Sequence, residues 1–124
     1  MGFTEIDLDV GRPPNPEEWI TVRCLVDSGA VYSVIPGSVL ASLGIRPTQE
    51  EEFDLANGQV IRRKKGIAAF RYEGRIGGAD VIFGEEGDAN LLGAFTLEAL
   101  GLALDPLKRE LTPLRMLLAL QKRP

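Results

Sequence analysis

The residues best suited to chemistry lie in positions 24–30, CLVDSGA, where an apolar run ends in an acid and a glycine. Residues 20–26 begin with alternating polarity and end in apolar side chains, which predicts a strand entering a core. Asp27 then lies at the buried end of this strand, where a carboxylate is costly to ionise unless hydrogen-bond donors surround it. Ser28 and Gly29 supply a hydroxyl and a permissive backbone, as a tight active-site loop requires.

Composition excludes several other chemistries. The sequence has no histidine, which rules out Ser-His-Asp and Cys-His catalysis. Cys24 is the only cysteine, so a zinc site is disfavoured, and we expect neither a metal nor another cofactor. Its place in an apolar strand predicts an inert core thiol, which suits a reducing compartment.

The length, net charge and hydropathy of the sequence favour one folded domain without nucleic-acid or membrane partners. The length of 124 residues suits one domain, and the net charge of −4 gives no nucleic-acid footprint. No apolar run approaches the roughly 20 residues that cross a bilayer, and the first residues lack the pattern of a signal peptide. We therefore expect a cytoplasmic protein.

Short strands dominate the rest of the pattern. Residues 3–10 alternate apolar and polar side chains, and the proline-rich segment 11–16 turns the chain back into the strand at 20–26 as a hairpin. Further strands are expected over residues 31–35, 53–56, 59–62, 67–72, 75–83, 89–93, 102–105 and 110–114. This pattern predicts an all-β fold, closed or sandwich-like, with one or two short helices.

Two short helices accompany the strands. Ser38 is placed to cap a helix over residues 39–43 that Gly44 ends. Residues 95–101 have helical spacing of apolar side chains and stop at a glycine. The apolar tail at 115–124 is a candidate dimer contact or core element.

A hairpin is also expected around Asn57-Gly58, the dipeptide most typical of a two-residue turn. The strand before this turn is expected to start at Phe53, with the acidic residues 50–52 as its solvated approach. The basic residues 62–65 that follow are assigned to a solvated strand face or turn, because the chain is acidic overall.

These features, taken in order, resemble the retropepsin-like (retroviral-type) single-domain aspartic proteases. An apolar pair precedes Asp27-Ser28-Gly29-Ala30, a hairpin tip follows about 30 residues later, and Leu91-Leu92-Gly93 precedes a short helix. The resemblance covers roughly residues 3–114 and implies a closed β-barrel of the acid protease fold that is active as a two-fold dimer. We therefore assign residues 1–114 to the protease domain.

The resemblance implies a role for each matched residue. Asp27 of each copy would activate water, because two adjacent carboxylates share a proton and act together as base and acid. The sequence has no second Asp-Ser/Thr-Gly, so a homodimer must supply the other carboxylate. Ser28 and Gly29 would hold the loops and the peptide substrate. The flap and substrate-binding residues would be Leu55, Ala56, Asn57, Gly58 and Gln59, and Leu91, Leu92 and Gly93 would support the site.

Two other interpretations use the same residues. A retropepsin-like fold could serve as a dimeric peptide-binding or scaffolding module with little or no proteolysis, and it could retain Asp27. In a monomeric β-barrel binding domain, Asp27 would only cap its own loop, as aspartates commonly do in turns. Loss of cleavage in Asp27→Asn and the mass in solution would separate the three interpretations.

Overall fold

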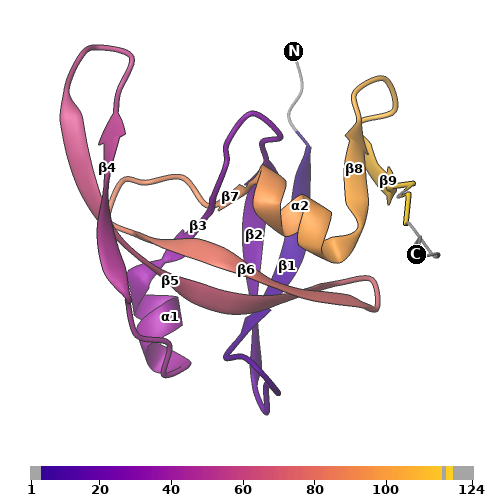
Figure 1. Cartoon of the computed structure of the whole chain (residues 1–124), viewed down its shortest axis with the longest axis horizontal. Coiled ribbons are helices and arrows are strands. Elements are labelled where there is room, and N and C mark those ends of the chain that lie inside the picture. The colour runs from indigo at the N-terminus through magenta and orange to yellow at the C-terminus, as the bar shows by residue number, and fades with distance from the viewer. Residues whose placement is uncertain (1–3, 116, 119–124) are drawn as a thin grey trace, which may run out of the picture.

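The computed structural model describes residues 4–115 and 117–118, and their strands and two short helices follow one another as shown in Figure 1. The elements in chain order are β1 (Glu5–Gly11), β2 (Trp19–Val26), β3 (Ser33–Pro36), α1 (Gly37–Ser42), β4 (Gln49–Asp54), β5 (Val60–Tyr72), β6 (Arg75–Gly84), β7 (Leu91–Leu92), α2 (Ala94–Leu100), β8 (Leu102–Asp105) and β9 (Glu110–Pro113). Neither helix is long and apolar enough to cross a membrane, and no other helix occurs in the described residues.

The larger sheet closes on itself. Its strand order is β1-β2-β7-β3-β6-β5-β4, and β5 also pairs with β1, so that six strands form a barrel with β4 attached outside it. Val10 lies opposite Ile20 on one side and opposite Phe70 on the other. This arrangement confirms the predicted closed all-β fold with two short helices.

Alternation along the strands builds the core inside this barrel. Ile6, Leu8 and Val10 of β1 are buried, as are Cys24 and Val26 of β2. Burying a side chain of this size contributes about 1.5–3 kcal/mol, so each strand is fixed with one face inward. Because Val26 at the end of β2 is buried, the direction in which the chain continues into the Asp27 loop is also fixed.

Helix α1 differs from the prediction at its start. The helix begins at Gly37, its N-cap residue is Pro36, and no side chain caps it, so the assignment of Ser38 as a cap is wrong. The physical reason is that β3 runs directly into the helix: Pro36 still pairs with Gly84 of β6, which fixes the residue in the capping position. Gly44, with φ of +80°, follows the helix end as predicted.

The β4–β5 hairpin is longer than predicted and has a different turn. Its first strand starts at Gln49 rather than Phe53, so residues 50–52 are part of the strand. The N–H of Leu55 donates to the Gln59 carbonyl (2.8 Å) and that of Gly58 to the Leu55 carbonyl (2.9 Å). Gly58 has φ of +86°, which makes this a three-residue turn ending in a left-handed glycine, so the two-residue prediction is wrong.

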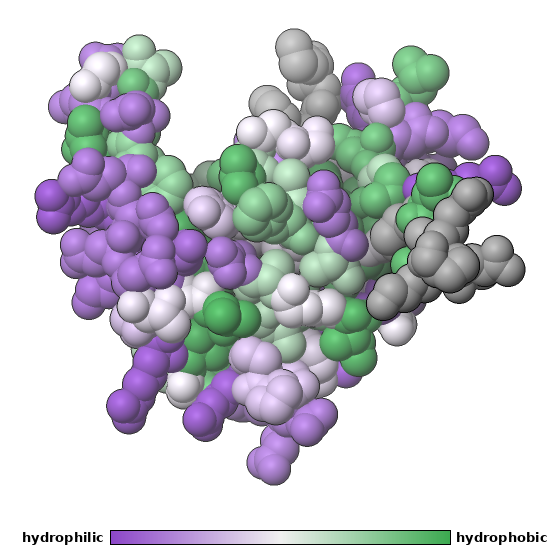
Figure 2. All heavy atoms as spheres, in the orientation of Figure 1, coloured by the Kyte–Doolittle hydropathy of each residue, from purple (hydrophilic) through white to green (hydrophobic). Residues whose placement is uncertain are grey.

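Charged side chains cover the outside of this hairpin. Figure 2 shows them gathered on the projecting arm. Arg62 lies 2.8 Å from Glu52 and 3.9 Å from Glu50, with all three side chains more than half exposed. Such exposed pairs contribute about 0–1 kcal/mol each. They help to align the two strands without adding much stability.

The C-terminal part packs against the barrel as a helix and a separate hairpin. Helix α2 ends at Gly101, which has φ of +71°, as predicted, and β8 and β9 form a two-stranded sheet of their own. Thr4 Oγ1 donates to the Arg109 carbonyl (3.0 Å), which ties this hairpin to the start of β1. Most of the tail at 115–124 lies outside the described residues, and its dimer contact stays a prediction.

Candidate active site

The loop after β2 holds Asp27 by its backbone. The Asp27 N–H donates to the Leu92 carbonyl (3.0 Å), and the Ala30 N–H donates to the Asp27 carbonyl (3.1 Å). Asp27 Oδ1 accepts the Gly29 N–H (3.0 Å). The Asp27 residue is half-buried and Ser28 is exposed, so one side of the carboxylate is held while the other is accessible.

Strand β7 lies directly behind this loop. Leu91 and Leu92 pair in parallel with Leu25 and Val26, and Leu92 is fully buried. The apolar side chains thus fill the space under the loop, and their backbone supplies the acceptor for Asp27. The structure brings the predicted loop and the predicted supporting residues together.

Gly93 is the point where the chain passes closest to the loop. A Cβ atom at this position would lie 2.5 Å from the Tyr32 carbonyl oxygen and 3.0 Å from that of Ala30. The next N–H, of Ala94, donates to the Ala30 carbonyl (2.7 Å). The crossing therefore requires a glycine, because any side chain would push the loop and helix α2 apart.

A buried hydroxyl pair fixes the same crossing. Ser33 and Thr96 are both fully buried, and their hydroxyl oxygens lie 2.5 Å apart. Ser33 Oγ also accepts the Gly93 N–H (2.9 Å). Each buried polar atom thus has a partner, which links β3, the Gly93 crossing and helix α2 into one unit.

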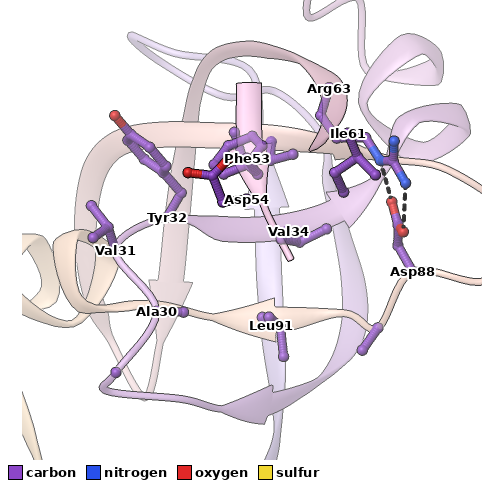
Figure 3. Close-up of a pocket in the computed structure, with 13 residues that line it drawn as sticks. Ala30, Val31, Tyr32, Val34, Phe53, Asp54, Ile61, Arg63, Asp88 and Leu91 are labelled. Carbon is purple, nitrogen blue, oxygen red and sulfur yellow. Dashed lines mark hydrogen bonds and ion pairs between the residues drawn. The ribbon is translucent and has the colours of Figure 1, made fainter. Parts of the chain in front are cut away.

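A pocket of about 540 Å³ opens beside the Asp27 loop. Figure 3 shows Val31 and Tyr32 at one side of it and Arg63 and Asp88 at the other. Its lining residues come from the Asp27 loop, β3, the β4–β5 hairpin, β6, β7 and the segment before β7: Gly29, Ala30, Val31, Tyr32, Val34, Phe53, Asp54, Ile61, Arg63, Ile82, Asp88, Ala89 and Leu91. The pocket is mostly apolar and continuous with the loop that carries Asp27.

The strands of the hairpin border this pocket, but its tip does not. Phe53, Ile61 and Arg63 contribute to the lining, whereas residues 55–59 at the tip do not, and all five tip residues are exposed. The predicted flap thus projects from the barrel as an arm (Figure 1). In the single chain, the residues of its tip are exposed to solvent.

Aromatic side chains connect the hairpin to the loop. The Tyr32 ring packs nearly perpendicular to the rings of Phe53 (centroids 6.3 Å apart) and Phe95 (5.6 Å). The Lys65 ammonium lies 5.1 Å from the centre of the Tyr32 ring and 3.2 Å from Asp80. Edge-to-face contacts of this kind stabilise by roughly 0.5–1.5 kcal/mol each, which fixes one wall of the pocket.

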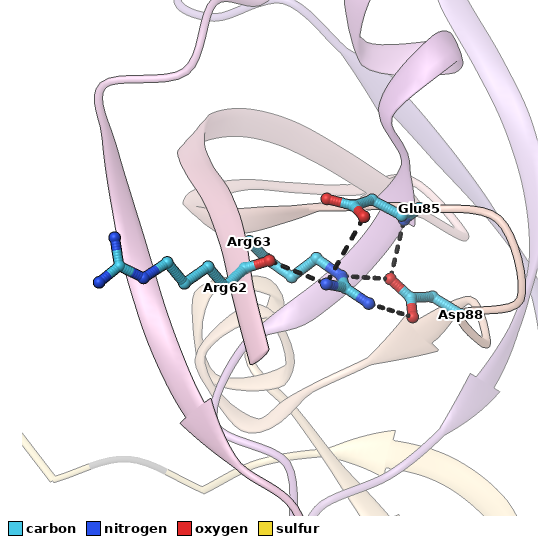
Figure 4. A network of polar contacts seen from close by, with 4 residues as sticks. All are labelled: Arg62, Arg63, Glu85 and Asp88. Carbon is cyan, nitrogen blue, oxygen red and sulfur yellow. Dashed lines mark hydrogen bonds and ion pairs between the residues drawn. The ribbon is translucent and has the colours of Figure 1, made fainter. Parts of the chain in front are cut away.

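The opposite wall contains a bidentate ion pair. Arg63 Nε lies 2.7 Å from Asp88 Oδ2, and Nη2 lies 3.0 Å from Oδ1. Asp88 Oδ2 also accepts the Glu85 N–H (2.8 Å), as Figure 4 shows. The hydrogen bond from Arg63 lowers the pKa of Asp88, and the same bond raises the pKa of Arg63. Both groups therefore stay charged over the whole physiological range.

Cys24 takes no part in the site. It is fully buried and free, and burial raises the pKa of its thiol to about 12. The prediction of an inert core thiol is confirmed.

Among the pocket residues that sequence reasoning missed are Tyr32, Phe53, Arg63 and Asp88. A signal was present in the alternation of β5, which places Ile61, Arg63 and Lys65 on one face and the exposed Arg62 and Lys64 on the other. Only Arg62 and Lys64 are exposed, so the assignment of the whole basic run to a solvated face is wrong for the other two residues. The partner Asp88 lies far along the chain, where no local pattern indicates it.

Known proteins of one class share this sequence pattern. A family model described as aspartyl protease matches residues 18–95, a range that includes Asp27, the β4–β5 hairpin and Leu91–Gly93. The chain belongs to this family, and the retropepsin-like resemblance seen in its sequence is confirmed.

The fold agrees with a solved structure of the same class. The solution structure of the simian foamy virus (mac) protease is similar with a TM-score of 0.51, covering 75% of this chain and 92% of the viral chain at 20% identity. No curated protein matches the sequence. The likeness shows that this chain has the retroviral protease fold.

Proposed function

We propose that the protein is a homodimeric aspartic endopeptidase in which Asp27 of each copy acts on a shared water molecule. One observation carries the proposal: in an aspartyl protease family member, the only Asp-Ser-Gly loop holds its carboxylate half-exposed on a backbone fixed by Leu92. One chain supplies one such carboxylate, so a second copy completes the pair.

The chemistry follows from two carboxylates that share one proton. The ionised Asp27 accepts a proton from water as the water oxygen attacks the peptide carbonyl, and the protonated Asp27 donates its proton to the carbonyl oxygen. The tetrahedral diol then collapses: one diol hydroxyl gives its proton to the ionised Asp27, the C–N bond breaks, and the leaving nitrogen receives the proton of the other Asp27. The products are a carboxylic acid and an amine, and the pair again holds one proton.

The neighbouring residues support this chemistry in the proposed dimer. Ser28 is exposed in the single chain, and its hydroxyl is available for hydrogen bonds between the two loops. The exposed tip at residues 55–59 would close over an extended peptide, adding backbone hydrogen bonds and excluding water. The apolar pocket favours apolar substrate side chains beside the scissile bond.

The test is cleavage of a mixed peptide library by the wild type and by Asp27→Asn at several pH values, with the mass in solution recorded. Asp7→Asn is the matched control, because Asp7 lies on the outside of β1 in an exposed pair with Arg23. We expect the wild type and Asp7→Asn to cleave as dimers with an acidic optimum, and Asp27→Asn to lose about 10²- to 10⁴-fold in rate.

Any of the following results would contradict this proposal. A monomer that cleaves, or cleavage unchanged in Asp27→Asn, would exclude the shared pair. Dimers of both proteins without any cleavage would favour the peptide-binding or scaffolding module that the same sequence allows. A rate that is flat from acid to alkaline pH would also contradict the shared proton.

A further inference from the structure

The ion pair on the pocket wall is more shielded than the neighbouring exposed pair of Arg62 and Glu52 on the outside of the hairpin. The side chains of Arg63 and Asp88 are 16% and 24% exposed, whereas that of Arg62 is 68% exposed. Arg63 joins β5 to the loop between β6 and β7, and both partners line the pocket. Their charges therefore lie where a bound side chain would meet them.

The two partners neutralise each other almost completely. Arg63 uses Nε and Nη2 on Asp88, and its Nη1 donates to the Arg62 carbonyl (2.8 Å) with Glu85 3.6 Å away. The Asp88 carboxylate accepts both guanidinium bonds and the Glu85 N–H. A paired charge in a shielded site attracts little else, but a charge left without its partner there is strongly unfavourable and seeks a counter-ion.

The remaining lining gives the pocket an apolar character. Val34, Ile61, Ile82 and Leu91 contribute aliphatic side chains. The third charged lining residue, Asp54, is exposed, and its carboxylate points toward the Tyr32 side of the pocket (Figure 3). Water and salt screen such a charge, so the Arg63–Asp88 pair decides the electrostatics of the opposite wall.

We propose that the Arg63–Asp88 ion pair is a specificity determinant: while intact it makes this pocket accept an aliphatic substrate side chain, and loss of either partner makes the pocket select a charged one. The inference rests on the proposed function in that the occupant is a side chain of an extended peptide. Without Arg63, the Asp88 carboxylate attracts a cationic side chain. Without the Asp88 charge, the Arg63 guanidinium attracts an anionic one.

A purely structural role for the pair predicts something different. The pair also ties strand β5 of the hairpin to the 85–88 loop, so either single substitution would loosen the pocket. Loosening weakens the binding of all peptides alike and gives no preference for charge. Opposite changes of charge preference in the two single variants therefore distinguish a specificity determinant from a structural brace.

The test measures peptide binding in the Asp27→Asn background, which separates it from catalysis. The probes are fluorescein-labelled peptide pools in which one position at a time is fixed as Leu, Lys or Glu, and the readout is fluorescence anisotropy. The variants are Arg63→Met, Asp88→Asn and the double variant, each checked for folding by urea unfolding. Arg62→Met is the matched control, because the neighbouring Arg62 does not line the pocket and its side chain points away from Asp88 (Figure 4).

We expect Arg63→Met to shift the affinity ratio of Lys to Leu pools toward Lys by about tenfold at one position, as a hydrogen-bonded charge pair would. Asp88→Asn should shift the ratio of Glu to Leu pools toward Glu by about tenfold. The double variant should return to the aliphatic preference, and Arg62→Met should keep it. If Arg63→Met does not fold, Asp88→Asn and the double variant decide the question.

Several outcomes would overturn the inference. One is an equal loss of affinity for all peptide pools in both single variants, and another is a shift of charge preference in the same direction in both. The inference also fails if the double variant has a charge preference as altered as that of the single variants, or if the folded protein binds no pool. The proposed function fails separately, when the wild type cleaves no peptide in the library, and the binding data still decide the role of the pair.

Discussion

Replacing Gly93 by alanine tests the close crossing behind the Asp27 loop. The new Cβ atom would lie 2.5 Å from the Tyr32 carbonyl oxygen and 2.6 Å from its carbon. A normal carbon–oxygen contact is about 3.3–3.6 Å, so the two segments must separate by roughly 1 Å. The neighbours are backbone atoms of a loop bonded to helix α2, and neither can move alone.

The size of the effect follows from this displacement. Overpacking costs about 1–3 kcal/mol, and the bonds from Ala94 N–H to Ala30 and from Gly93 N–H to Ser33 add about 1 kcal/mol each when they are strained or lost. We expect the free energy of unfolding to fall by about 3–5 kcal/mol. That is a large share of the roughly 5–15 kcal/mol typical of a folded domain.

Urea unfolding followed by the fluorescence of Trp19, the only tryptophan, measures this loss. Gly78→Ala is the matched control, because a Cβ atom on that strand residue would meet only the Ala68 carbonyl oxygen, at 3.7 Å. The control should change stability by less than about 1 kcal/mol. Equal midpoints for the two variants would refute the argument that the crossing requires a glycine.

Three further predictions concern buried or paired groups. Ser33→Ala leaves the Gly93 N–H and the buried Thr96 hydroxyl without a partner, so the free energy of unfolding in urea should fall by about 1–3 kcal/mol. The control Ser38→Ala, at an exposed residue, should change it very little. The folded-state pKa values of Asp9 and Asp88 are lowered by hydrogen bonds from Thr21 and Arg63, so their stabilisation should be present above about pH 4 and lost as the pH falls further; a flat stability profile in acid would contradict this. Cys24 should react with a thiol reagent only in urea, and rapid labelling of the native protein would contradict its burial.

Local patterns were sufficient to predict most of the strands and the loop that supports the site. Alternation located β1 and β2, and the glycines at 44 and 101 located the helix ends, because these features depend on residues close together in the chain. The resemblance to the retropepsin-like proteases predicted that Asp27 and Leu91–Gly93 meet. Parallel pairing of β2 with β7 then places them in contact.

The errors arose where distant pairing decides the local structure. Pro36 is fixed by β6, so Ser38 cannot cap helix α1. The acidic residues 50–52 continue the strand because a basic strand lies opposite them. Arg63 is turned inward by the register of β5 toward Asp88, and no property of the basic run itself indicates this partner.

The contact between Asp27 and Leu92 also governs when the candidate catalytic loop takes shape during synthesis. At roughly 5–20 residues per second, Leu92 is added several seconds after Asp27. Closure of the barrel must likewise wait for Phe70 to reach Val10. A nascent chain therefore carries its candidate catalytic acid long before the strand that holds it, so the site forms only after most of the chain has been made.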